Sequence, residues 1–261
     1  MSDATGPALL ARIIAHRGAS GDAPENTLAA LSLAADHGAS CVEIDVSISA
    51  DGIPFVHHDD KLDRCTSGQG LLCEHSAAEL DLLDAGKGMP GYSGEPLPRL
   101  TAVFDLLQAR GLGLNLEIKP RKGLERETVD AICALVEERW PAHLPLVFSS
   151  FSWSSLAMAR ERLPDTPRGL LVGAIPDDWQ ALTDTYGCRN IHCDGASLTP
   201  QQTRELRQAG LGIYCYTVND PEQAARLLGI SGEQSAEHDA TAGVHGIFTD
   251  YPKRLAEYLG T

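Results

Sequence analysis

Two carboxylates stand at alternate positions in a short aliphatic segment. Residues 41–46 read Cys-Val-Glu-Ile-Asp-Val, so that Glu43 and Asp45 alternate with apolar side chains. A period of two is typical of a β-strand whose two faces differ. In the middle of a sheet such carboxylates point into protein, where unpaired charge is costly. We therefore expect a cationic group between them.

A later segment supplies a third carboxylate of the same kind. Residues 112–119 again alternate aliphatic with polar side chains, and Glu117 lies on the polar face. Glu43, Asp45 and Glu117 would repel one another if all three were ionised, so either one is protonated or a divalent cation neutralises them. All-oxygen ligation favours a hard ion, Mg²⁺ or Ca²⁺, over Zn²⁺.

Two imidazoles and two cations stand at the ends of extended segments. His16 and Arg17 end the first apolar run, His58 ends the run 53–58, and Lys119 follows Glu117 by two residues. Arginine and lysine suit phosphate oxygens, and histidine titrates near neutrality, as general acid–base catalysis requires. The set matches phosphodiester hydrolysis. A metal and a cationic clamp would stabilise charge on phosphorus, one histidine would activate the nucleophile, and the other would protonate the leaving alkoxide.

The elements that must position these residues alternate between strand and helix. The runs 41–47 and 53–58 are joined by too few residues for a parallel crossover, so they are expected to form an antiparallel ribbon. The other eight extended segments are each followed by a helical pattern, which predicts a (β/α)₈ TIM barrel in one domain spanning 1–261. These segments are 12–17, 41–47, 112–119, 146–151, 169–172, 190–194, 212–218 and 246–249. A doubly wound sheet is the rival, but no Gly-x-Gly-x-x-Gly follows a strand.

Two segments interrupt this alternation. Residues 59–98 are rich in glycine and proline and show no periodicity. In a compact domain this indicates a functional insertion and not an element of the core. Residues 230–243 form a long, acidic connection between a helix and the following strand, on the barrel face opposite the chemistry. We expect no catalytic part for this second segment.

Composition limits the partners and the compartment. The net charge is -15, which disfavours nucleic acid and anionic membranes. No run approaches the roughly 18 apolar residues of a membrane span, and no signal peptide is evident, so stable membrane insertion is not expected. The chain has seven cysteines and no Cys-x-x-Cys pair. This pattern predicts a reducing compartment, and hence a cytoplasmic location.

Eight short motifs follow one another in an order that resembles the glycerophosphodiester phosphodiesterase family. A lone His-Arg-Gly would be weak, but the ordered set covers nearly the whole chain. The motifs are His16-Arg17-Gly18, Glu25-Asn26-Thr27, Glu43-x-Asp45, Asp51-Gly52, His58-Asp59, Glu117-Ile118-Lys119, Tyr216-Thr217-Val218-Asn219 and Thr249-Asp250-Tyr251-Pro252.

The resemblance implies a TIM barrel that hydrolyses glycerophosphodiesters to glycerol 3-phosphate and an alcohol. It implies a divalent metal on Glu43, Asp45 and Glu117, with His16 and His58 as the acid–base pair. It also implies that the glycerol 2-hydroxyl can attack phosphorus first, through a cyclic phosphate.

The resemblance further implies which residues lie at the barrel mouth. Residues 59–98 would be the family's insertion over the mouth and would help to shape substrate selection. Arg17 and Lys119 are expected to bind the phosphate. The family often has Trp where this chain has Tyr216. The ring of Tyr216 would still cover the pocket, so Tyr216 is expected to bind the substrate.

Some choices stay open at this point. Only one of His57 and His58 can face the site, and the resemblance favours His58. Asn26 could orient the His-Arg-Gly loop or cap a helix, and the pair Asn219-Asp220 is interpreted first as a helix cap. His192, His238 and His245 are expected to be structural.

Two other functions compete with the leading one. A lysophospholipase D or phospholipase C-like enzyme could use the same barrel, but it would need an apolar groove within 59–98. A phosphate-binding protein with a decayed site would have lost one of the five metal or histidine positions, and none is lost.

Overall fold

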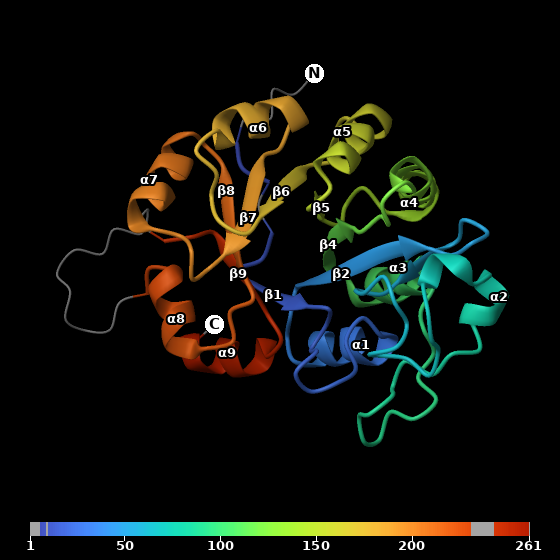
Figure 1. Cartoon of the computed structure of the whole chain (residues 1–261). Coiled ribbons are helices and arrows are strands. Elements are labelled where there is room, and N and C mark those ends of the chain that lie inside the picture. Colours follow the sequence, from blue (N-terminus) through green and yellow to red (C-terminus); the bar gives the residue numbers. More distant parts are fainter. Residues whose placement is uncertain (1–5, 9, 231–242, 261) are drawn as a thin grey trace.

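The computed structural model describes residues 6–8, 10–230 and 243–260, and these residues form a closed parallel barrel (Figure 1). Eight strands are parallel, and the barrel closes because β1 pairs with both β2 and β9. The additional strand, β3, runs antiparallel to β2. The strands are β1 (Ile13–His16), β2 (Cys41–Ile48), β3 (Pro54–Val56), β4 (Gly113–Ile118), β5 (Leu146–Ser150), β6 (Arg168–Val172), β7 (Asn190–Asp194), β8 (Gly212–Tyr216) and β9 (Gly246–Thr249). The (β/α)₈ barrel and the ribbon are both confirmed.

Helices surround the barrel, one after each parallel strand (Figure 1). Each one covers the aliphatic outer face of neighbouring strands. They are α1 (Leu28–Asp36), α3 (Leu100–Arg110), α4 (Glu125–Arg139), α5 (Trp153–Arg162), α6 (Trp179–Tyr186), α7 (Pro200–Gln208), α8 (Pro221–Leu227) and α9 (Pro252–Leu259). A short helix, α2 (Ala77–Leu80), and a 3₁₀ turn (Leu72–Glu74) lie between β3 and α3.

Local capping signals set the ends of several helices. Thr199 accepts a hydrogen bond from the backbone N–H of Gln202 and begins α7 with proline in its first turn. Gly111 ends α3 with φ of 66°, the left-handed conformation that favours glycine. Both boundaries agree with the sequence pattern.

The two faces of β2 and β4 have opposite characters. Ile44 and Leu116 point outward and are fully buried against the helices. Glu43 and Glu117, at alternate positions, point into the barrel. Side chains below them close the barrel interior with one apolar cluster of Ile14, Cys41, Tyr214 and Phe248. The carboxylates of β2 and β4 therefore lie on the inner face of the barrel, above this apolar cluster.

Residues 59–98 have a small core of their own. Leu62, Leu72 and Leu80 are fully buried there against Phe55. Among the described residues, no helix is long and apolar enough to cross a membrane. All seven cysteines lie in described segments and are free thiols. The acidic connection 230–243 lies almost entirely outside the described residues.

Candidate active site

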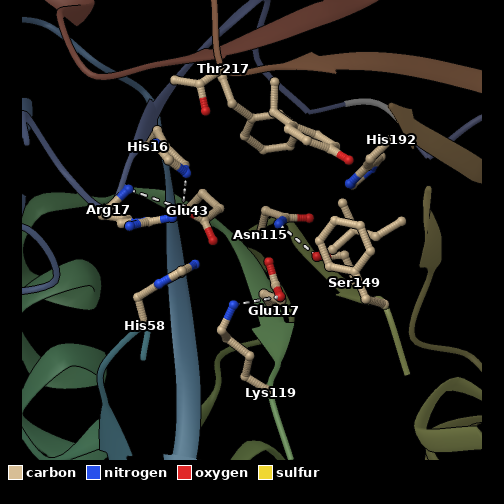
Figure 2. Close-up of a pocket in the computed structure, with 14 residues that line it drawn as sticks. His16, Arg17, Glu43, His58, Asn115, Glu117, Lys119, Ser149, His192 and Thr217 are labelled. Atoms are coloured by element: carbon tan, nitrogen blue, oxygen red, sulfur yellow. Dashed lines mark hydrogen bonds and ion pairs between the residues drawn. The ribbon is translucent and has the colours of Figure 1, made fainter. Parts of the chain in front are cut away.

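A cavity of about 270 Å³ opens at the carboxyl ends of the strands (Figure 2). This is the face of a (β/α)₈ barrel on which catalytic residues gather. It is lined by His16, Arg17, Glu43, His58, Asn115, Glu117, Lys119, Ser149, Phe151, Leu171, His192, Tyr216, Thr217 and Phe248.

The three predicted metal ligands come together beside this cavity. Glu43, Asp45 and Glu117 each offer a carboxylate oxygen, and these oxygens all lie within 4.8 Å of one another. The parallel register of β2 and β4 brings this about, because Asp45 is paired with Glu117. The side chains are buried, with exposures of 4%, 1% and 9% respectively. Such a set of oxygens suits a hard divalent cation.

The crowding of these carboxylates shifts their pKa values. Burial first, and then repulsion by Asp45, raises the pKa of Glu43 well above its usual range and that of Glu117 to about 7. Burial would also raise the pKa of Asp45, but Arg17 and Lys119 outweigh it and hold that pKa below its ordinary value. The cluster therefore takes up protons unless more positive charge is supplied.

Two cations already lie against the cluster. Arg17 Nε is 3.2 Å from Asp45 Oδ2, and its backbone N–H donates to Glu43 Oε2 at 3.0 Å. Lys119 Nζ lies 3.6 Å from Asp45 Oδ1 and 3.5 Å from Glu117 Oε1. Both side chains also line the cavity, so they can contact a phosphate there.

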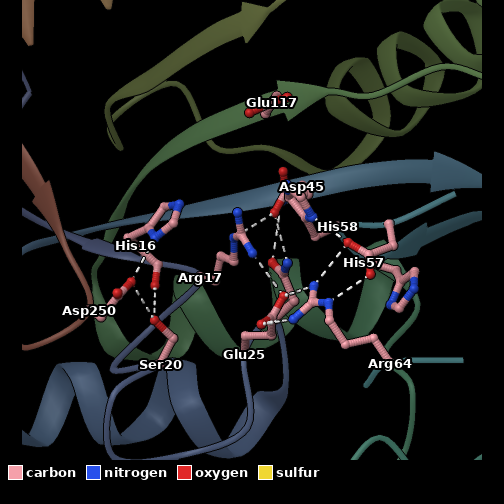
Figure 3. Close-up of polar contacts among 12 residues, drawn as sticks. His16, Arg17, Ser20, Glu25, Asp45, His57, His58, Arg64, Glu117 and Asp250 are labelled. Atoms are coloured by element: carbon pink, nitrogen blue, oxygen red, sulfur yellow. Dashed lines mark hydrogen bonds and ion pairs between the residues drawn. The ribbon is translucent and has the colours of Figure 1, made fainter. Parts of the chain in front are cut away.

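A carboxylate from the end of the barrel holds His16. Its Nδ1 lies 2.7 Å from Asp250 Oδ1, and the Ser20 hydroxyl also donates to that oxygen at 2.9 Å (Figure 3). The other ring nitrogen, Nε2, faces the carboxylate cluster, 4.0 Å from Glu43 Oε2. Asp250 therefore orients the imidazole and leaves Nε2 directed at the cavity.

His58 is held in the same manner from the other side. Its Nδ1 lies 2.6 Å from Asp59 Oδ1, and its ring lines the cavity. Burial, partly offset by Asp45, lowers the pKa of His58 below its ordinary value. His57 is turned away, with Nε2 3.0 Å from the carbonyl oxygen of Lys61 (Figure 3). The structure thus places His58, and not His57, at the site.

Arg64 joins the carboxylate that holds His58 to the carboxylate that holds Arg17. It donates to Glu25 Oε2 at 2.6 Å and to Asp59 Oδ2 at 2.7 Å, with a second hydrogen bond to each carboxylate (Figure 3). Glu25 also accepts from Arg17 Nη1 at 2.9 Å. A chain of charged hydrogen bonds therefore runs from Arg17 through Glu25, Arg64 and Asp59 to His58.

Asn26 and Asn219, whose roles the sequence left open, both contact carboxylates of the site. Asn26 takes a left-handed backbone conformation and donates to Asp45 Oδ2 at 2.8 Å, whereas Thr27 caps α1. Asn219 donates to Asp250 Oδ2 at 2.7 Å, and Asp220 caps α8. The helix-cap interpretation of this pair is confirmed for Asp220, whereas the amide of Asn219 supports the residue that holds His16.

Comparison with known proteins agrees with this geometry. The model of the glycerophosphoryl diester phosphodiesterase family matches residues 16–254. This chain belongs to that family. It is accordingly a phosphoric diester hydrolase.

Relatives match along nearly their whole lengths. A glycerophosphodiester phosphodiesterase of Caldanaerobacter subterraneus is 31% identical over 250 residues, covering 93% of this chain and 95% of that protein. The solved structure of an Oleispira antarctica phosphodiesterase, in complex with the product sn-glycerol-3-phosphate, is 40% identical with a TM-score of 0.89 and covers 97% of this chain and 98% of its own. The structure of the Agrobacterium tumefaciens glycerophosphodiester phosphodiesterase is 29% identical with a TM-score of 0.77, and the match covers 95% of this chain and 100% of that one.

Several site residues of this family member were not assigned a role from the sequence. Asp250 and Glu25 stood in the quoted motifs, so the motifs alone could have pointed to them. Arg64 lies in the irregular segment, where no periodicity marks it. His192 was expected to be structural, yet it lines the cavity and is fully buried.

An aromatic pair lies at the rim. Tyr216 packs edge-on against Phe151, with ring centroids 6.0 Å apart, and its hydroxyl donates to the carbonyl oxygen of Val172 at 2.7 Å. Phe151 is 52% exposed. Tyr216 thus presents its ring, and not its hydroxyl, to the cavity.

Proposed function

We propose that this enzyme hydrolyses glycerophosphodiesters to glycerol 3-phosphate and an alcohol, with His16 and His58 as the acid–base pair. The observation that carries the proposal is that the two imidazoles are held in the same way. Each is held at Nδ1 by a carboxylate, Asp250 or Asp59, and faces one cavity beside the acidic cluster. The product bound to the Oleispira antarctica relative supports the same reaction.

Glu43, Asp45 and Glu117 would hold a divalent metal, Mg²⁺ or Ca²⁺. Their oxygens lie within 4.8 Å of one another, and burial together with repulsion by Asp45 raises the pKa values of Glu43 and Glu117, which supports a site that takes a cation. When bound, such an ion supplies charge stabilisation to the phosphate oxygens.

The remaining side chains would bind the substrate and move protons. Arg17 and Lys119 would hold the phosphate oxygens, and Tyr216 would cover the pocket. One imidazole would take the proton from the attacking oxygen, first the glycerol 2-hydroxyl and then the water that opens the cyclic phosphate, as each new O–P bond forms. The other imidazole would give a proton to the leaving alkoxide as the old P–O bond breaks.

The test is release of glycerol 3-phosphate from glycerophosphocholine with Mg²⁺ or Ca²⁺ present. His16→Ala and His58→Ala should each lower kcat by roughly 10²-fold or more, because each removes a proton-transfer group. His143→Ala, at an exposed histidine, is the matched control and should keep full activity. Ordinary turnover in both site variants would refute the assignment.

The domain assignment remains our proposal. The chain 1–261 would act as a single domain, and residues 59–98 would act at the barrel mouth. In support, Arg64 reaches from this segment to Glu25 and to Asp59 beside His58. No residue of 59–98 is among those that line the cavity in the described part of the chain, so its influence would pass through these contacts.

A lysophospholipase D or phospholipase C-like activity is the second candidate. Its apolar groove would need exposed leucines in 59–98, and Leu82, at 85% exposure, is such a residue. Leu72 and Leu80 instead fill the small core of that segment. Comparing glycerophosphocholine with lysophosphatidylcholine separates the two functions, and we expect the deacylated substrate to be preferred.

The cellular setting also stays a prediction from the sequence. We propose a cytoplasmic enzyme that acts on a small molecule and does not bind nucleic acid, because the chain carries a net charge of -15 and seven cysteines. Cell fractionation with an antibody would test the location.

A further inference from the structure

Beyond the carboxylates, the cavity extends to polar atoms in the barrel interior. Asn115 lies two residues before Glu117 on β4, and His192 lies on β7. Both side chains line the cavity, with exposures of only 2% and 0%. In Figure 2, the nitrogens of His192 point toward the side of the cavity where Asn115 lies.

Three polar atoms of these two side chains are unpaired in the described part of the chain. Among residues 6–8, 10–230 and 243–260, Asn115 Oδ1 and both ring nitrogens of His192 have no hydrogen bond. The amide of Asn115 is fixed, because its Nδ2 donates to Ser149 Oγ at 2.9 Å. An unpaired buried polar atom costs about 1–3 kcal/mol. This cost arises at three atoms, and the two residues that carry them both line the cavity.

The ring of His192 is held rigidly by its neighbours. Its centroid lies 5.3 Å from that of Tyr214 and 5.2 Å from that of Phe248. Gly169 makes room for it, since a Cβ at that position would come within 2.5 Å of Nε2. Burial lowers the pKa of His192 to about 3, so the ring is neutral and carries one donor and one acceptor.

A hydroxyl group fits this set of atoms best. It can donate to Asn115 Oδ1 and at the same time accept from an N–H of His192. An ionised carboxylate or a phosphodiester has no hydrogen to donate to Asn115. An ammonium group cannot accept a hydrogen bond at all.

We propose that Asn115, Ser149 and His192 form a hydroxyl-binding subsite for the glycerol part of the substrate, resting on the proposed function above. The glycerol would then point into the barrel, with its terminal hydroxyl at His192. The leaving alcohol would point outward past Phe151, which is 52% exposed at the rim. The enclosed subsite would accept only the glycerol part, while the open rim would admit different alcohols.

The test compares two ligands that differ by one hydroxyl. The metal-loaded enzyme is titrated with glycerol 3-phosphate and with 1,2-propanediol 1-phosphate (2-hydroxypropyl phosphate), which lacks the terminal hydroxyl and keeps the secondary one. Wild type should bind the deoxy compound about tenfold or more weakly, because the N–H of His192 and the acceptor Asn115 Oδ1 both stay unpaired. In His192→Phe this difference should shrink to less than about threefold.

Controls separate this role from stability and from the reaction. His192→Gln keeps a polar side chain and should retain part of the discrimination, and it stands in if the phenylalanine variant does not fold. Tyr214→Phe is the matched control, because its hydroxyl contacts Leu10 and not the cavity, and it should discriminate like wild type.

The outcomes are decisive in either direction. Equal discrimination in wild type and in the folded His192 variants would overturn the subsite, even if glycerol 3-phosphate is released normally. Discrimination that depends on His192 would support the subsite even if glycerophosphocholine is not hydrolysed. A failure to hydrolyse glycerophosphocholine would count against the proposed reaction alone.

Discussion

Replacing Glu117 by Gln removes one of three crowded carboxylates and keeps the size of the side chain. Burial and Asp45 raise the pKa of Glu117 from 4.5 to about 7. The folded state therefore holds this proton more tightly than the unfolded state. In the metal-free protein, the contribution of this group to stability is full below about pH 4.5 and is lost as the pH rises through about 7. The interval between the two pKa values corresponds to about 3 kcal/mol.

Thermal unfolding in the presence of a chelator measures this effect. For a chain of this length, about 1 kcal/mol shifts Tm by roughly 2–4 °C. Between about pH 5 and about pH 8, Tm of the wild type should therefore fall by about 6–12 °C more than Tm of Glu117→Gln. Adding Mg²⁺ or Ca²⁺ at the higher pH should restore the wild type and have much less effect on the variant, which lacks one ligand. Glu138→Gln, at an exposed carboxylate, should behave as wild type in both respects.

Two results would refute this reasoning separately. Parallel curves of Tm against pH for wild type and Glu117→Gln, under chelation, would show that the carboxylates do not crowd one another. An equal rise in Tm on metal addition in both proteins would show that Glu117 is not a ligand.

The other expected effects concern the residues that support the two histidines. Asp250→Asn should lower kcat about tenfold or more with little change in KM, because the carboxylate that orients His16 is lost. Steady-state kinetics on glycerophosphocholine would measure this loss. A change confined to KM would contradict the orienting role. Arg64→Ala should lower kcat several-fold, since Asp59 loses the partner that fixes it against His58. Arg64→Lys should restore little, because an ammonium cannot bridge two carboxylates in the bidentate manner of a guanidinium, and full recovery in that variant would argue against the bridging role.

The strands and their two faces could be predicted because the information is local. Alternation of Glu43 and Asp45 with aliphatic residues needs only a period of two to place both carboxylates on one face. Once eight strand–helix units are recognised, barrel closure brings the strand ends together. The meeting of Glu117 with the other two carboxylates follows from these two facts.

The supports of the site could not be derived in this way. Asp250 reaches His16 across 234 positions of the chain, and Arg64 reaches Glu25 across 39 from a segment without periodicity. The sequence offers no local pattern that fixes such contacts, because they depend on how β9 and the segment 59–98 pack. His192 was expected to be structural for a related reason. A histidine within an apolar strand pattern shows its lack of a partner only when the barrel interior is known.

The balance of charge at the site connects the metal with the substrate. If all are ionised, Glu43, Asp45 and Glu117 contribute three negative charges against the two positive charges of Arg17 and Lys119, which leaves -1. A phosphodiester adds another negative charge, and a divalent ion would bring the sum to zero. Each ligand therefore relieves the repulsion that the other would meet, and by linkage each should tighten the binding of the other. An enzyme with a net charge of -15 can thus hold an anionic substrate through a small site at which the charges cancel.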